Sequence, residues 1–122
     1  MFFPSEKMIP WLNQALDAAY RRHEVLSGNV ANADTPDYQA RDIDFTGYLQ
    51  AELDGAGHHG PNPGLPNPEF RGGAEASLDG NQVNIEQEMV RMSSNQMFYD
   101  LASEVTARSL NGIRYAIDEG GQ

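Results

Sequence analysis

The sequence of 122 residues contains no cysteine. Disulfide bonds, thiolate zinc sites and a cysteine nucleophile are therefore excluded. Basic residues are also few, with 8 Lys and Arg against 18 Asp and Glu. The resulting net charge of −10 disfavours binding to nucleic acid or to an anionic membrane. No apolar run approaches the roughly 20 residues of a membrane-spanning helix.

The amino-terminal segment also lacks a basic region followed by a long apolar stretch. Such a combination marks a secretory signal peptide, so we expect no cleaved signal. The length of the chain fits a single domain. Composition divides the chain into residues 1–34, with helical periodicity, residues 35–80, with most of the net negative charge and of the helix breakers, and residues 81–122, again with helical periodicity. We predict a helix in each terminal part, with a corner motif and a Gly/Pro-rich acidic loop between them.

Apolar residues in the amino-terminal part recur at alternating spacings of three and four, from Ile9 to Ala33. This spacing is that of the a/d seam of a coiled coil. Pro10 would remove a hydrogen bond from a helix that began earlier, so we predict a short turn near residues 5–8 and a helix over about 9–33. His23 falls on the seam, where a partly buried histidine with one hydrogen bond is favoured over a titrating switch.

The carboxy-terminal part begins with a capping signal, because Asn84 is followed by Gln87 and the first turn is acidic. Apolar positions then recur from Ile85 to Ile117, and we predict a helix that ends near Asp118. The predicted fold is mainly α: two long terminal helices in an antiparallel coiled-coil-like pair, with an irregular extended or loop middle. The expected seam residues are Ile9, Leu12, Leu16, Leu26, Val30, Met89, Met92, Tyr99, Leu110, Ile113 and Ile117.

The sequence offers little evidence of catalytic groups. Asp42 and Asp44 flank Ile43 and would share a side of an extended chain, as a catalytic carboxylate pair does, but a solvated acidic strand or turn is favoured. His58 and His59 are adjacent in a Gly-rich loop, without a third ligand at a spacing typical of zinc sites. We therefore predict no catalytic, cofactor or metal site, and a metal-dependent hydrolase that uses these histidines stays a minor alternative.

A corner is predicted where the amino-terminal helix ends. Asn29 and Asn32 can bond their side chains to the backbone there, and Thr35 is forced towards an extended conformation by Pro36. The single glycine in residues 28–34 does not make a phosphate-binding loop. The corner motif comprises Asn29, Asn32, Thr35, Pro36 and Tyr38.

The segment from Ser27 to Phe45, which reads SGNVANADTPDYQARDIDF, resembles the signature of the flagellar axial rod protein family. Its last part, Ala40 to Phe45, is similar to proximal-rod members, and scattered residues from Asn81 to Ile117 agree in order and spacing. Two positions depart from the family pattern: Asp37 stands where glycine is usual, and Ser94 stands where glutamate is common. Aspartate at this turn favours type I geometry or a strained left-handed residue.

The resemblance implies a structural subunit of the basal-body rod of the bacterial flagellum, required for motility. Such subunits pack their terminal helices as a coiled coil, assemble helically in the periplasm, and leave the cytoplasm by flagellar type III export without a cleaved signal. The implied partners are other copies of the chain, the adapter FliE, the rod protein FlgC, and the flagellar export gate and inner-membrane ring region. A small acidic helical adapter or export chaperone of a secretion system is the alternative.

Overall fold

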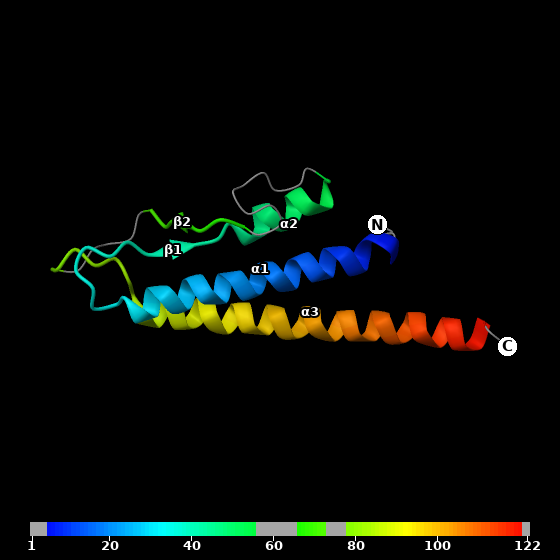
Figure 1. The fold of residues 1–122 in the computed structure, drawn as a ribbon. Helices are drawn as coiled ribbons and strands as arrows, with labels where there is room; N and C mark the ends of the chain where they lie inside the picture. The colour runs from blue at the N-terminus through cyan, green and yellow to red at the C-terminus, as the bar shows by residue number, and fades with distance from the viewer. Residues whose placement is uncertain (1–4, 56–65, 73–77, 121–122) are drawn as a thin grey trace.

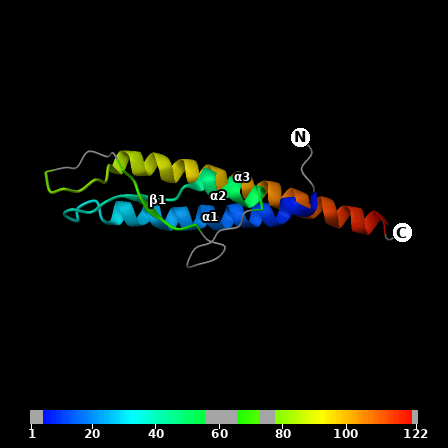
Figure 2. The same cartoon turned by 90° about the horizontal axis from the view of Figure 1, so that it is seen from above.

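The computed structural model describes residues 5–55, 66–72 and 78–120. Two long helices, α1 (Ser5–Ala31) and α3 (Ile85–Gly120), lie side by side and run in opposite directions (Figure 1). The chain between them forms strand β1 (Arg41–Asp42), helix α2 (Phe45–Leu53) and strand β2 (Glu69–Phe70). Viewed from above, α2 lies over the pair of long helices (Figure 2). The prediction of a mainly helical fold with two long terminal helices is confirmed.

Helix α1 begins earlier and ends earlier than the sequence predicted. It starts at Ser5 and includes Pro10, so the expected turn before residue 9 is wrong. A proline this close to the start of a helix removes only the hydrogen bond to the carbonyl of residue 6, and the helix continues through it. At the other end, the Asn32 and Ala33 N–H groups donate to the carbonyls of Asn29 and Val30 at 3.2 Å, so the last turn tightens and releases the chain.

Helix α3 has the predicted start. The Gln87 N–H donates to Asn84 Oδ1 at 3.2 Å, and Glu86 and Glu88 occupy the first turn. The expected cap at Asn84 is therefore confirmed. The helix contains 36 residues and is about 54 Å long.

Small side chains are buried where α1 and α3 meet. Ala19 of α1 is fully buried, as is Ala15 one turn before it, and Ala102 of α3 is nearly so. Asn95, also buried, donates its Nδ2 to the Ala19 carbonyl at 2.8 Å. A side chain as short as asparagine reaches a helix backbone only when the two helices approach closely. Alanine and asparagine thus lie at the centre of the pair, together with the predicted residues Leu12 and Leu26, which are also buried.

The middle of the chain is more ordered than the irregular segment that was predicted. Strands β1 and β2 pair antiparallel, with Arg41 opposite Phe70 and Asp42 opposite Glu69. Asp44 caps α2, because its Oδ1 accepts the Gly47 N–H at 3.1 Å. The sequence indicated no helix here, since α2 has only nine residues and contains a glycine. Much of the predicted Gly/Pro loop, with His58 and His59, lies outside the described residues.

Apolar and aromatic side chains hold the middle segment on the long helices. Ile43 and Tyr48 are buried. The Phe45 ring packs edge-on against Phe98 of α3, with 4.8 Å between the ring centroids. Ile43 and Phe45 thus anchor this segment.

Replacement of Ala19 by leucine should overpack the contact between α1 and α3. We expect Ala19→Leu to lower the free energy of unfolding by about 1–3 kcal/mol, because the added methylenes must push the two helix backbones apart. Urea denaturation followed by circular dichroism measures this change. The matched control is Ala107→Leu on the exposed surface of α3, which should change stability by less than about 0.5 kcal/mol. Equal stabilities of the two variants would contradict the close approach.

Candidate functional site

The predicted corner is a tight turn with a left-handed residue. The Tyr38 N–H donates to the Thr35 carbonyl at 3.3 Å, and Asp37 has a φ of 62°. Pro36 precedes a residue with positive φ in a turn of this kind, which is the pattern of a type II turn. Of the two conformations expected for Asp37, the structure has the left-handed one, in the place where glycine is usual.

A second segment closes the corner from the other side. The Asp37 N–H donates to the Asp79 carbonyl at 3.0 Å, and the Gln82 N–H donates to the Tyr38 carbonyl at 3.0 Å. Gly80, with a φ of 79°, lies directly under the Asp37 carboxylate, where a Cβ would collide. The turn is therefore fixed by the chain that leads into α3, although 40 residues of sequence separate the two.

Two asparagines bond the corner to the helix ends. The Asn32 Nδ2 donates to the Gly28 carbonyl at 2.8 Å, and its Oδ1 accepts the Thr35 hydroxyl at 3.1 Å. The buried Asn81 donates to the carbonyls of Asn32 and Thr35, at 2.8 and 2.6 Å. Side-chain bonding to the backbone at Asn32 agrees with the predicted helix stop.

Asn29 has a different role, because its side chain points away from the helix end. Its Oδ1 accepts the Arg41 N–H at 3.0 Å, and its Nδ2 donates to the Arg41 carbonyl at 2.7 Å. The amide thus pairs with β1 as a neighbouring strand would. Tyr38 also donates its hydroxyl to Asn29 Oδ1, at 3.4 Å. Asn29 is fully buried, so it joins α1 to the middle segment from within.

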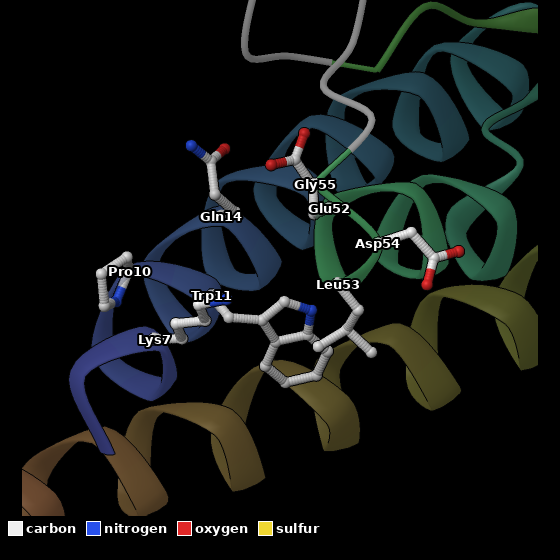
Figure 3. Close-up of a pocket in the computed structure, with 8 residues that line it drawn as sticks. All are labelled: Lys7, Pro10, Trp11, Gln14, Glu52, Leu53, Asp54 and Gly55. Carbon is white, nitrogen blue, oxygen red and sulfur yellow. The ribbon is translucent and has the colours of Figure 1, made fainter. Parts of the chain in front are cut away.

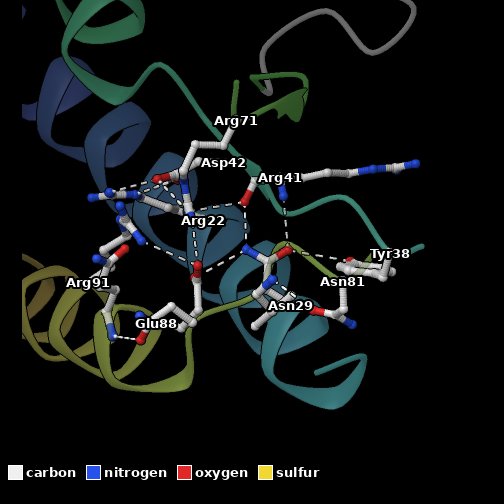
Figure 4. Close-up of polar contacts among 12 residues, drawn as sticks. Arg22, Asn29, Tyr38, Arg41, Asp42, Arg71, Asn81, Glu88 and Arg91 are labelled. Carbon is white, nitrogen blue, oxygen red and sulfur yellow. Dashed lines mark hydrogen bonds and ion pairs between the residues drawn. The ribbon is translucent and has the colours of Figure 1, made fainter. Parts of the chain in front are cut away.

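The other neighbour of Asn29 is a buried carboxylate on α3 (Figure 4). Glu88 is fully buried, and its Oε2 accepts the Asn29 amide at 3.1 Å. Its Oε1 accepts from the guanidinium groups of Arg71 and Arg91, the latter at 3.3 Å. A charge buried to this degree is tolerated only when it is paired and hydrogen-bonded.

Asp42 of β1 extends this arrangement to α1. Arg22 holds its carboxylate with two hydrogen bonds, from Nε at 2.9 Å and from Nη2 at 3.1 Å. Arg71 donates to the same carboxylate at 3.1 Å and so bridges Asp42 and Glu88. We call Arg22, Asn29, Asp42, Arg71 and Glu88 the polar cluster.

Electrostatics within the polar cluster favour the charged forms of Asp42 and Arg71. Burial alone raises the pKa of Asp42, but the hydrogen bonds from Arg22 and the Ile43 N–H and the charges of Arg22 and Arg71 together hold it below its usual value. Burial alone lowers the pKa of Arg71, and the carboxylates of Glu88 and Asp42 outweigh that effect and raise it. Both carboxylates are occupied by guanidinium groups, so the arrangement serves to hold segments together and is poorly suited to proton transfer. The idea that Asp42 and Asp44 form a catalytic pair is not supported, since Asp44 caps α2 instead.

An open cleft lies between the first turns of α1 and the end of α2 (Figure 3). Trp11 donates its indole N–H to the Leu49 carbonyl at 3.3 Å, and the Tyr48 hydroxyl donates to Gln14 Oε1 at 2.8 Å. Burial, with the nearby charges of Glu52 and Asp17, raises the pKa of Tyr48 to about 12, so its hydroxyl stays protonated. The cleft is lined by Lys7, Pro10, Trp11, Gln14, Glu52, Leu53, Asp54 and Gly55.

No three acidic or histidine side chains within residues 5–55, 66–72 and 78–120 are grouped so that they could hold a metal ion. Among the helices that the structure describes, none combines the length and the apolar character needed to cross a membrane.

The predicted seam residues differ widely in burial. Leu12 and Leu26 are buried, whereas Met89, Leu110, Ile113 and Ile117 are exposed in the isolated chain. The half-buried members are Ile9, Leu16, Val30, Met92 and Tyr99. His23 is exposed, so the prediction that it is partly buried is wrong. The role of these residues in assembly stays a prediction.

The side of α3 that faces α1 combines one predicted column of residues with one that was missed. Met92 and Tyr99 belong to the predicted pattern. The neighbouring column consists of Glu88, Asn95 and Ala102, which are spaced seven residues apart and are all buried. The sequence instead predicted that Met89 and the residues at the same spacing after it would face α1. A search for hydrophobic periodicity does not detect a column that consists of two polar side chains and an alanine. Arg71 was an available signal for an ionic contact, because it is one of only two basic residues in residues 35–80.

The chain is similar along most of its length to bacterial proteins named "Flagellar basal body rod protein FlgB". It is 33% identical over 124 residues to the protein of Salmonella typhimurium, with 88% of this chain and 90% of that protein covered. It is 31% identical to the Escherichia coli protein, with the same coverage. It is also 33% identical over 117 residues to the Cereibacter sphaeroides protein, with 85% and 88% covered. No protein-family model matches the chain.

The lowered pKa of Asp42 predicts a pH-dependent contribution to stability. At neutral pH, Asp42→Asn should cost about 1–3 kcal/mol, because Arg22 and Arg71 then face a neutral amide. Since the pKa of Asp42 is lower in the folded chain, its stabilising effect is complete above the unfolded value of about 3.9 and is lost as the pH falls through the folded value.

Denaturation of both proteins over a range of pH tests this sign. The difference in unfolding free energy between the wild type and Asp42→Asn should be constant near neutrality and shrink below about pH 4. Asp17→Asn, at an exposed position of α1, is the matched control and should show little effect. A difference that persists unchanged into strong acid would contradict the ion pairs.

Proposed function

The chain belongs to the family of the flagellar basal body rod protein FlgB, and from this membership we propose how it works as a structural subunit of the rod. The observation that carries the function is the similarity of 31–33% identity over about 88% of the chain to rod proteins of several species. The alternative of a small adapter or export chaperone is not supported.

We propose that copies assemble helically through their terminal helices, in coiled-coil-like contacts that each chain leaves incomplete. Exposed apolar residues on α3 support this, since monomeric proteins rarely leave a long apolar helix surface in water. Ile9, Leu16 and Val30 on α1 are only half-buried, so part of each side chain is accessible to another subunit. The exposed and half-buried seam residues then act between subunits, whereas Leu12 and Leu26 pack within the chain.

The proposed position is the proximal rod, in the periplasm, next to the inner-membrane ring and the flagellar export gate. Neighbours there are other copies of the chain, the adapter FliE and the rod protein FlgC, and type III export delivers the chain without a cleaved signal. Supporting this assignment, the stretch from Ala40 to Phe45 resembles proximal-rod sequences and has a defined structural role here. It carries Asp42 of the polar cluster, the buried Ile43 and the cap of α2.

We assign no catalysis to the chain. The assignment follows from the family, whose members named above are rod proteins. It is supported by the polar cluster, in which Arg71 and Arg22 occupy the two carboxylates that would otherwise be candidate bases. Residues outside the described ranges, including His58 and His59, do not enter this argument.

A charge at the proposed assembly seam should block rod formation. We expect Leu16→Asp to abolish motility and to reduce the yield of basal bodies at least tenfold, because the aspartate would be buried against a neighbouring subunit. The measurement is motility in soft agar together with electron microscopy of isolated basal bodies. Circular dichroism of the purified variant checks that the chain still folds.

Asn13→Asp is the matched control, since it adds the same charge to an exposed position of the same helix. It should swim normally. Normal basal bodies in the Leu16→Asp strain would refute the seam, and absence of the wild-type chain from basal bodies would refute the function itself.

A further inference from the structure

The first turns of α1, residues 5–14, have little support within the helix itself. In an α-helix each N–H donates to the carbonyl four residues earlier, so the first two such bonds would come from residues 9 and 10. Residue 10 is a proline and has no N–H, so one of these two bonds is missing. Residues 7–11 are all exposed or half-buried, so packing supports them only in part. Short helical stretches of this kind are stable only when another part of the protein holds them.

Helix α2 provides two contacts that hold these turns. Trp11 donates its indole N–H to the Leu49 carbonyl at 3.3 Å, and the Tyr48 hydroxyl donates to Gln14 Oε1 at 2.8 Å. Trp11 and Gln14 are three residues apart and lie on the side of α1 next to the end of α2 (Figure 3). Tyr48 is 1% exposed, so its ring packs between the two helices and water does not compete for its contacts. The first turns of α1 are therefore bonded to α2 from both of its buried ends.

The position of α2 depends in turn on the polar cluster. Asp42 belongs to the polar cluster, Ile43 is buried, and Asp44 caps α2. The Ile43 N–H donates to Asp42 Oδ1 at 2.7 Å, so these residues have little freedom relative to one another. The ion pairs of Asp42 with Arg22 and Arg71 thus fix the point from which α2 begins. An unbroken series of contacts connects the polar cluster to the first turns of α1.

The middle segment can be released while the two long helices stay paired. Asn95 bonds to the Ala19 carbonyl, and Ala102 is buried, without any contribution from the middle segment to that hydrogen bond. The middle segment itself consists of two strands of two residues and a helix of nine residues. Elements of this length are not stable alone. The segment is therefore either docked and ordered or released and unfolded, which makes it a two-state element.

We propose that α2 acts as a clasp on the first turns of α1. While the polar cluster holds the middle segment on the helix pair, α2 keeps residues 5–14 helical. Loss of the polar cluster releases α2, and residues 5–14 then open, whereas the remainder of α1 stays paired with α3. The order of these turns is thereby coupled to ionic contacts at Arg22, which lies about two helical turns beyond Gln14.

This coupling bears on assembly, and that part of the inference rests on the proposed function. Ile9 of the proposed seam lies in the first turns of α1, and Leu16 follows them directly. A chain with α2 released lacks this end of the seam, and a chain with α2 docked presents it. Because coupling between two sites is reciprocal, a neighbouring subunit that packs on these turns also favours the docked α2.

Amide hydrogen exchange of the purified Asp42→Asn variant tests the clasp at neutral pH. We expect residues 44–54 and residues 11–14 to exchange at least tenfold faster than in the wild type, because both open together. Residues 19–29 of α1, which lie nearer to the substituted side chain, should keep most of their protection. Trp11 is the only tryptophan of the chain, so quenching of its fluorescence by acrylamide gives a second readout and should rise at least twofold.

Tyr48→Phe tests the other end of the same series of contacts, and it serves alone if Asp42→Asn does not fold. It removes only the hydroxyl that donates to Gln14, so residues 11–14 should exchange at least threefold faster while the contacts of Asp42 remain. The matched control is Asp34→Asn, which makes the change from carboxylate to amide at an exposed position. It should leave exchange and quenching unchanged.

Three results would overturn the proposal. Residues 11–14 could keep wild-type protection in Asp42→Asn although residues 44–54 are released, or in Tyr48→Phe. All of α1 could exchange faster to the same degree, which indicates general destabilisation. Residues 44–54 could keep wild-type protection in Asp42→Asn, which shows that the polar cluster does not hold α2. All these measurements use the purified chain, whereas a chain absent from basal bodies would refute the proposed function and leave the clasp intact.

Discussion

The buried carboxylate of Glu88 is the interaction on which the arrangement of the chain depends. It belongs to α3, accepts the Asn29 amide of α1, and accepts the guanidinium of Arg71, which follows β2. Arg71 in turn reaches Asp42 of β1, which Arg22 of α1 also holds. A buried charge that loses one partner costs about 3–5 kcal/mol, so every segment that contributes to the polar cluster is constrained by it. The two long helices and the middle of the chain are therefore aligned by one set of ionic contacts.

Several large apolar residues of α3 take no part in this arrangement. Where α1 and α3 meet, Ala15, Ala19 and Ala102 are buried, and Asn95 fixes the register. Met97, Leu101 and Ile117 stay exposed on α3. Exposed apolar surface of this kind is typical of sites where proteins interact, and it supports the proposed contacts between subunits. Within the chain, polar groups fix the register of the segments.

Local features of the fold could be predicted from the sequence, whereas contacts between distant segments could not. The cap at Asn84 and the helix stop at Asn32 depend on residues within a few positions of each other. The sequence left two turn geometries open at Asp37, whose N–H bonds to the distant Asp79 carbonyl. The pairing of β1 with β2 joins strands separated by a long Gly/Pro-rich stretch, and neither strand exceeds two residues. In the sequence, Glu88 is one of the acids of the first helical turn, where it complements the helix dipole. Its partner Asn29 is 59 residues away, so the contact between them is not visible in the sequence. Its burial follows from tertiary structure alone.

Amide hydrogen exchange of the Glu88→Gln variant tests this dependence most directly. The account predicts that residues 38–54 and 69–71 exchange at least tenfold faster than in the wild type, while the centre of α3 keeps most of its protection, because the middle segment is released from the helix pair. Glu86→Gln, an exposed acid in the same helical turn, should leave exchange unchanged. Wild-type protection of residues 38–54 in the Glu88→Gln variant would contradict the account.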